Sequence, residues 1–221
     1  MFLLSNMPKL LQNKPSKIRF FTTAVHNESM KRNRILERKI SFEKHFHLWK
    51  DTQTPFSYIN RVVGKHQGQL LKELKQLDKN KSTKACVIDW GCGEGTSIKN
   101  IAQNFPNLKV MGFSIQSYPK WRQNQPHNLE YLHTTTNALE RYLSINKINV
   151  GVIYSYNAIA YLPPHEFVKH VINLRKVLIP HGKILFPTYP ILKNSPNAKQ
   201  LTASGYKLGY ENYFLVSLEK V

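Results

Sequence analysis

A glycine-rich segment in the middle of the chain carries the residues best suited to binding chemistry. From Val87 to Ser97 the sequence reads VIDWGCGEGTS, in which an apolar run gives way to glycines and then to a helical pattern. Glycines at such a turn let the backbone bend sharply and let a ligand approach the main chain. The helix start behind them offers free N–H groups to an anionic or carboxylate-bearing ligand. Asp89, at the strand end, is placed to accept a hydrogen bond from a ligand's ammonium group.

The glycine spacing leaves more than one interpretation open. The dinucleotide fingerprint G-x-G-x-x-G requires a third glycine where this chain has Thr96. A glycine turn without a ligand is a second interpretation. Asp89 followed by Gly91, Gly93 and Gly95 resembles motif I of the class I S-adenosylmethionine-dependent methyltransferases. The resemblance extends over about residues 84–190, where VGVIYSYNAIAYL resembles the family's fourth strand and LRKVLIPHGKILFPTYP its helix-to-strand passage.

The resemblance implies both a fold and a function. The implied fold is α/β, with a doubly wound, mostly parallel, seven-stranded Rossmann-like sheet and an N-terminal helical extension. The implied activity is methyl transfer from S-adenosylmethionine to a small-molecule or lipid-like acceptor. The residues that would hold this cofactor are Asp89, Gly91, Cys92, Gly93, Gly95, Ser114, Gln116, Thr135 and Tyr154.

Several acidic residues that the family uses around its cofactor are absent here. Ser114, followed by Gln116, stands where most members have the carboxylate that grips the ribose. Thr135 or Asn137 would replace the acid that binds the adenine amino group, and Gly151 replaces the acid at the start of the fourth strand. Either neutral groups hold the cofactor, or the fold persists without turnover. The alternative function is therefore a catalytically degenerate module that binds RNA or a protein partner through a basic surface.

Methyl transfer from a sulfonium mainly requires alignment of the acceptor and exclusion of water, and a general base only where the acceptor is protonated. The candidates near the expected methyl position are Tyr156, Asn157 and His165, with Tyr161 nearby; each is equally compatible with packing. The residues after the second strand that either flank the adenine or form a surface helix face are Tyr118, Trp121 and Arg122.

Short apolar runs alternate with helical periodicity along the rest of the chain, which favours a parallel sheet. We expect strands over 85–89, 108–113, 129–132, 150–154 and 183–186, with one or two more in 206–221, and helices over 57–77, 94–105 and 163–178. The expected organisation is a basic tail over 1–40, a helical extension or lid over 41–80 and the methyltransferase-like domain over 81–221.

Composition sets the remaining expectations. The chain has 221 residues, with 32 Lys and Arg against 13 Asp and Glu, a formal charge of +19 that attracts polyanions, nucleic acid included. Two cysteines form neither a disulfide framework nor a zinc pattern, and no apolar run is long enough to span a bilayer. We therefore expect no metal. The expected location is cytoplasmic or, if the acid-free N-terminal segment is a presequence, the mitochondrial matrix.

Overall fold

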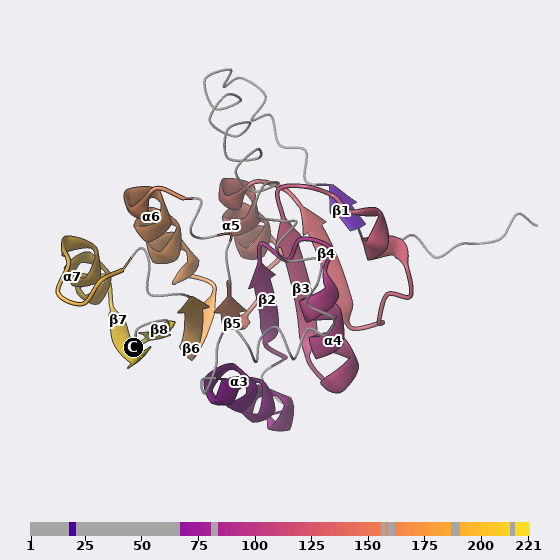
Figure 1. The fold of residues 1–221 in the computed structure, drawn as a ribbon, viewed down its shortest axis with the longest axis horizontal. Coiled ribbons are helices and arrows are strands. Elements are labelled where there is room, and N and C mark those ends of the chain that lie inside the picture. The colour runs from indigo at the N-terminus through magenta and orange to yellow at the C-terminus, as the bar shows by residue number, and fades with distance from the viewer. Residues whose placement is uncertain are drawn as a thin grey trace, which may run out of the picture.

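The computed structural model describes residues 18–20, 67–80, 84–155, 158, 162–186, 191–212 and 215–221. Its centre is one eight-stranded sheet with the order β1-β4-β3-β2-β5-β6-β8-β7 (Figure 1). The strands are β1 Ile18–Phe20, β2 Cys86–Trp90, β3 Lys109–Ser114, β4 Leu129–His133, β5 Val150–Tyr154, β6 Leu178–Phe186, β7 Tyr206–Asn212 and β8 Leu215–Lys220. The helices are α3 Gln67–Lys79, α4 Thr96–Asn104, α5 Thr136–Ile145, α6 Pro164–Leu174 and α7 Pro196–Ala203, with the 3₁₀ turn η3 Pro119–Arg122.

The strands from β2 to β8 form the doubly wound, mostly parallel sheet of seven strands that the sequence predicts. β2 lies between β3 and β5, and all pairs from β4 to β6 are parallel. β8, in the expected C-terminal region, inserts antiparallel between β6 and β7. β1 adds a short parallel strand beside β4. The order reverses at β2, so a crevice is expected at the carboxyl ends of β2 and its neighbours.

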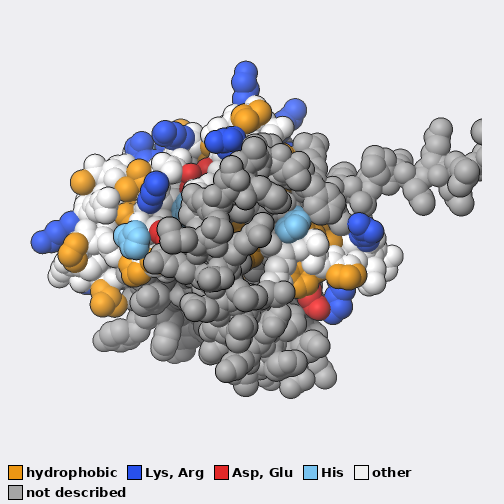
Figure 2. Space-filling view, turned by 90° about the horizontal axis from the view of Figure 1, so that it is seen from above, with side chains coloured by type: hydrophobic (Ala, Val, Ile, Leu, Met, Phe, Trp, Pro, Cys, Tyr) orange, Lys and Arg blue, Asp and Glu red, His pale blue; other side chains and the backbone are white. Residues whose placement is uncertain are grey.

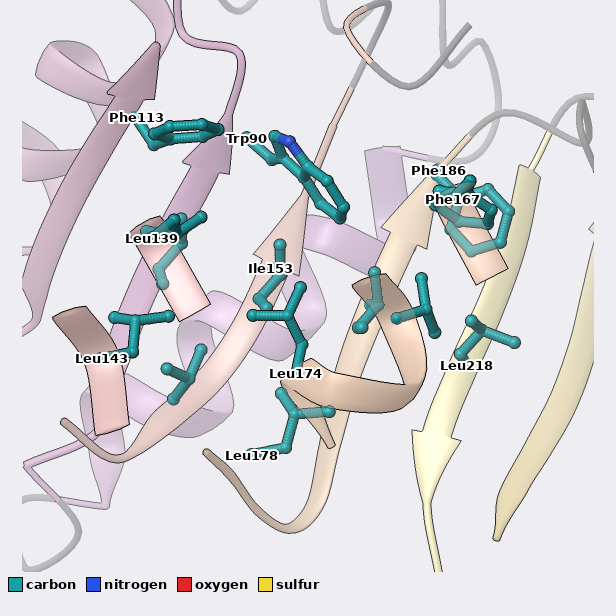
Figure 3. Close-up of a cluster of buried hydrophobic side chains, with 14 of the residues drawn as sticks. Trp90, Phe113, Leu139, Leu143, Ile153, Phe167, Leu174, Leu178, Phe186 and Leu218 are labelled. Atoms are coloured by element: carbon teal, nitrogen blue, oxygen red, sulfur yellow. The ribbon is translucent and has the colours of Figure 1, made fainter. Parts of the chain in front are cut away.

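Each face of the sheet carries its own apolar core. One core joins the sheet to α5, α6 and α7 and includes Trp90, Phe167 and Leu218. The other joins it to α3, α4 and η3. In Figure 3 Trp90 lies between Phe113 of β3 and Phe167 of α6, and its ring centroid is 6.2 Å from that of Phe167. The tryptophan next to Asp89 thus fixes the end of the central strand by packing.

Several boundaries differ from those expected. The part of the expected helix over 57–66 lies outside the described residues, and α3 continues past the expected break at Asp78 to Lys79. The helix α6 ends at Leu174, and not at Leu178. The strand expected over 183–186 begins earlier, at Leu178, where the register between β5 and β6 shifts. The expectations missed α5 and α7, whose N-caps Thr135 and Ser195 accept from backbone N–H groups.

The helix α3 packs against Gly151 of β5, the position at which the resemblance implies an acidic residue. A Cβ built on Gly151 of β5 would lie 2.7 Å from Leu77 Cδ1 and 3.2 Å from the Ala85 Cβ. Lys183 of β6 also binds Glu73 of α3, with 2.6 Å between Nζ and Oε1. Glycine at position 151 therefore makes room for α3. Among the described residues, no helix is long and apolar enough to cross a membrane.

Exchange of Gly151 for alanine is expected to destabilise the protein by about 1 kcal/mol through overpacking against Leu77. In a Leu77→Ala background the added methyl group fills the space that the leucine leaves, so the same exchange should cost less or become stabilising. Urea unfolding of the wild type, both single variants and the double variant measures this coupling. Strictly additive losses would contradict the proposed contact.

Candidate functional site

The carboxyl ends of the central strands bring the candidate residues together. Asp89 of β2 pairs in register with Gly112 of β3 on one side and with Tyr154 of β5 on the other. Ser114 at the end of β3 pairs with His133 at the end of β4. The four strand ends lie side by side at the end toward which the parallel strands point in Figure 1. This is the crevice position that binds ligands in open α/β sheets.

Asp89 is a buried carboxylate held by a tyrosine. Its side chain is 5% exposed, and Oδ2 accepts a hydrogen bond of 2.9 Å from the Tyr154 hydroxyl. The Tyr154 hydroxyl also lies 3.3 Å from Ser97 Oγ at the start of α4. A chain of polar groups therefore links the ends of β2 and β5 to the first turn of α4.

Burial governs the charge of this group. Desolvation raises the pKa of Asp89 to about 7, and the hydrogen bond from Tyr154 opposes that rise. Burial also holds the pKa of Tyr154 well above its ordinary value, so the tyrosine stays a hydrogen-bond donor. The same cause, together with the nearby Asp89, raises the pKa of the Cys92 thiol. Asp89 is thus poised for a cation, while Cys92 is not an activated nucleophile.

The glycines of the loop are required by its shape. Gly91, Gly93 and Gly95 have φ values of 92°, 53° and 81°, in the left-handed region that glycine adopts at little cost. A Cβ on Gly91 would collide with the side chain of Ala158, and one on Gly95 with the ring of Tyr131. Any side chain at these two positions would displace the loop.

Two aromatic side chains anchor the loop from the α4 side of the sheet. The Trp121 indole N–H donates to the Gly93 carbonyl oxygen at 2.8 Å, and the Tyr131 hydroxyl donates to the Gly95 carbonyl oxygen at 3.1 Å. The rings are stacked, 4.8 Å apart and 2° from parallel. The sequence left two alternatives for Trp121, contact with the adenine or a place on a surface helix face. Trp121 is fully buried, so neither alternative holds. Arg122 is exposed.

The start of α4 offers unsatisfied donors next to Asp89. Its N-cap is Gly95, which has no capping side chain, so the first-turn N–H groups lack intrahelical partners. A Cβ on Gly93 would meet no atom within 4 Å, so the space beside that residue is open. The Asp89 carboxylate and the first-turn N–H groups of α4 therefore lie on the two sides of the glycine loop in the chain, with open space beside Gly93.

The expected ribose and adenine sides are electrically neutral. Ser114 Oγ accepts from the Gln116 backbone N–H at 3.3 Å, and Gln116 Oε1 accepts from the Tyr118 hydroxyl at 3.3 Å. Ile115 between them is 55% exposed, an apolar surface beside the strand end. Thr135 caps α5 by accepting from the Ala138 backbone N–H at 3.3 Å. Its hydroxyl is thereby partly committed to the fold.

The expected catalytic residues are only partly placed. His165 is exposed in the first turn of α6, which follows β5. Tyr156, Asn157 and Tyr161 lie outside the described residues. No group of three His, Cys, Asp or Glu side chains within the described ranges could hold a metal ion.

Sequence reasoning missed three residues that shape the site: Ser97, Tyr131 and Ala158. The periodicity of α4 and β4 marks Ser97 and Tyr131 only as members of their elements. Their partners lie 57 and 36 residues away in the chain, and no local signal announces such contacts.

Comparisons with known proteins agree on the fold. No protein family description and no curated protein matches the sequence. Among solved structures, magnesium protoporphyrin IX methyltransferase from Synechocystis PCC 6803 with bound SAH matches with a TM-score of 0.54 at 12% identity, covering 88% of this chain and 100% of that one. The Burkholderia thailandensis 1,6-didemethyltoxoflavin-N1-methyltransferase matches with a TM-score of 0.52 at 12% identity, covering 90% and 93%. The chain therefore has the fold of the class I S-adenosylmethionine-dependent methyltransferases.

Proposed function

We propose that the chain binds S-adenosylmethionine at the ends of β2, β3 and β5 and catalyses methyl transfer to a small-molecule acceptor. The observation that carries this proposal is the buried Asp89 carboxylate beside the uncapped start of α4. An amino acid moiety carries an ammonium and a carboxylate, which match these two features of the site. The two solved structures named above contain S-adenosylhomocysteine, which supports the choice of cofactor.

The groups present fit this cofactor. Asp89 would accept from its ammonium, and the free N–H groups in the first turn of α4 would bind its carboxylate. Ser114 and Gln116 would contact the ribose through single hydrogen bonds in place of a bidentate carboxylate. Ile115 offers an apolar surface for the adenine. A ribose side without a carboxylate makes the Asp89 contact more important for affinity.

The bound cofactor supplies an electrophilic methyl group on a sulfonium, so the protein has little covalent chemistry to perform. Its residues orient the two reactants and exclude water. Tyr154 keeps the Asp89 carboxylate fixed, and Trp121 and Tyr131 keep the loop in place. His165 is exposed at the start of α6. Where the acceptor is protonated, His165 would take its proton.

We propose that the methyl acceptor is a small molecule. The two structural neighbours act, by their names, on magnesium protoporphyrin IX and on 1,6-didemethyltoxoflavin. We propose that the acceptor enters beside the end of β5 and the start of α6, where Tyr156, Asn157 and His165 follow the strand in the sequence.

Calorimetric titration with S-adenosylhomocysteine tests the proposal first. The wild type should bind in the micromolar range, and Asp89→Asn should weaken binding on the order of 10- to 100-fold, because a charge-assisted hydrogen bond is lost. Glu94→Gln is the matched control, since Glu94 lies in the same loop but pairs with Lys120. Equal losses in both variants, or tighter binding of NAD than of S-adenosylhomocysteine, would refute the assignment.

The raised pKa of Asp89 predicts that affinity depends on pH. The ligand's ammonium requires the ionised carboxylate, so binding below pH about 7 must expel a proton and should weaken up to about tenfold per pH unit. Affinity should level off above that value. Tyr154→Phe removes the hydrogen bond that lowers the pKa of Asp89, so the midpoint should move to higher pH. A midpoint that moves to lower pH would contradict this account of the carboxylate.

Trp121→Phe tests the anchoring of the glycine loop. This variant keeps a ring stacked near Tyr131 but removes the N–H donor to the Gly93 carbonyl. Loss of one hydrogen bond worth about 1 kcal/mol should weaken S-adenosylhomocysteine binding several-fold. Tyr142→Phe removes a buried hydrogen bond to Glu130 away from the loop and serves as control. The control should lower stability and leave affinity unchanged; unchanged affinity in Trp121→Phe would show that the bond does not position the loop.

A further inference from the structure

The end of the sheet opposite the candidate site carries a row of lysines. Each strand from β3 across to β7 has a lysine at that end or within three residues of it. In their order across the sheet, the members of this lysine row are Lys109, Lys84, Lys147, Lys176, Lys220 and Lys207.

The strand register places the row along one edge. Cys86 pairs with Lys109 on one side and with Val150 on the other, and Val150 pairs with Leu178. Lys220 pairs with Tyr206, because β8 runs antiparallel and ends where β7 begins. Neighbouring strands lie about 4.8 Å apart, so the six positions span roughly 24 Å.

The middle of the row consists of exposed cations. Lys84, Lys147 and Lys176 are exposed and form no ion pair among the described residues. The other three lysines are partly engaged. Lys109 Nζ lies 4.0 Å from Glu130, Lys220 donates to a backbone carbonyl oxygen, and Lys207 helps to lower the pKa of Glu219.

Two acidic groups near this end are engaged by residues outside the row, and Asp78 of α3 forms no ion pair among the described residues. Glu73 binds Lys183, and Glu219 Oε1 lies 2.9 Å from His181 Nδ1. The pKa of Glu219 is lowered mainly by this hydrogen bond, which keeps the group ionised and engaged. Glu73 and Glu219 are therefore bound by side chains other than the middle lysines of the row.

Two of these lysines occupy backbone positions that disfavour them. Lys84 has φ 40° and Lys147 has φ 49°, in the left-handed region where glycine or asparagine is preferred. A residue chosen for the turn alone would not be lysine. Both turns therefore carry a cation at a cost in stability, which is a pattern typical of functional positions.

We propose that the lysine row binds the phosphate backbone of a nucleic acid. A strand of nucleic acid carries one negative charge about every 3.4 Å, so a row of roughly 24 Å faces several phosphates in line. A bilayer surface fits less well, because interfacial anchoring favours aromatic side chains, and no aromatic is exposed at this end in the described part of the chain. Contacts to phosphates alone would bind nucleic acid independently of its nucleotide sequence. The row lies at the other end of the strands from Asp89, so this binding is independent of the proposed methyl transfer.

The test is fluorescence anisotropy with a labelled single-stranded RNA of about 15 nucleotides, with duplex DNA as a second probe. The full-length variant Lys84→Asn/Lys147→Asn/Lys176→Gln removes the middle of the row, and asparagine suits the two left-handed positions, so folding is preserved. Affinity should fall at least tenfold near 0.1 M salt. The slope of log K against log salt should shrink by about 2, for three lost phosphate contacts.

The matched control is Lys169→Gln/Lys193→Gln/Lys199→Gln, which removes the same charge from exposed positions on and before α6 and α7. It should bind RNA within about twofold of the wild type. Equal losses in both triple variants would show diffuse attraction to a basic protein and overturn the proposal. Absence of RNA binding in the wild type would also overturn it, as would binding only to vesicles containing about one third phosphatidylserine. Calorimetry with S-adenosylhomocysteine should give the same affinity for both variants.

Discussion

A carboxylate buried at the end of the central strand is the interaction on which the candidate site depends. Burial of an ionised group is costly unless a partner compensates for it. Within the described part of the chain, the side chain of Asp89 accepts a hydrogen bond from the Tyr154 hydroxyl and from no other side chain. Because burial disfavours the ionised form, the pKa of Asp89 rises to about 7 in the ligand-free protein. A cationic ligand group would supply the missing countercharge. The fold thus maintains, at this one place, a group that stability alone would not select.

The surrounding structure holds that carboxylate and the glycine loop in one geometry. Trp90, the next residue, is packed in the core between β3 and α6 (Figure 3). On the other face, Trp121 and Tyr131 bind the loop carbonyls. Figure 2 views this end of the molecule, where Lys and Arg side chains stand out at the rim of the described surface. A rigid loop with a neutral ribose side would bind its ligand mainly through the amino acid end.

The sequence predicts the fold well because local signals repeat along it. The short apolar runs and the Asp89–Gly95 turn identify β2 and the turn that connects it to α4. They also predict that the central strands are parallel. Local patterns do not reveal that Gly151 makes room for Leu77, because that contact joins residues 74 positions apart in the numbering. The burial of Trp121 depends in the same way on Tyr131 and Gly93. The sequence shows which residues stand where the acids are missing. The contacts of these residues, such as the capping of α5 by Thr135, are visible only in three dimensions.

The central claim is that ligand binding occurs at the Asp89–Gly95 turn and the end of β3. Backbone amide chemical shifts of the ¹⁵N-labelled protein, recorded with and without S-adenosylhomocysteine, test it most directly. The account predicts that the largest changes fall on the amides of Gly91, Gly93, Gly95 and Gln116, with little change in the lysine row. Largest changes at another part of the sheet, or none at millimolar ligand, would contradict the account.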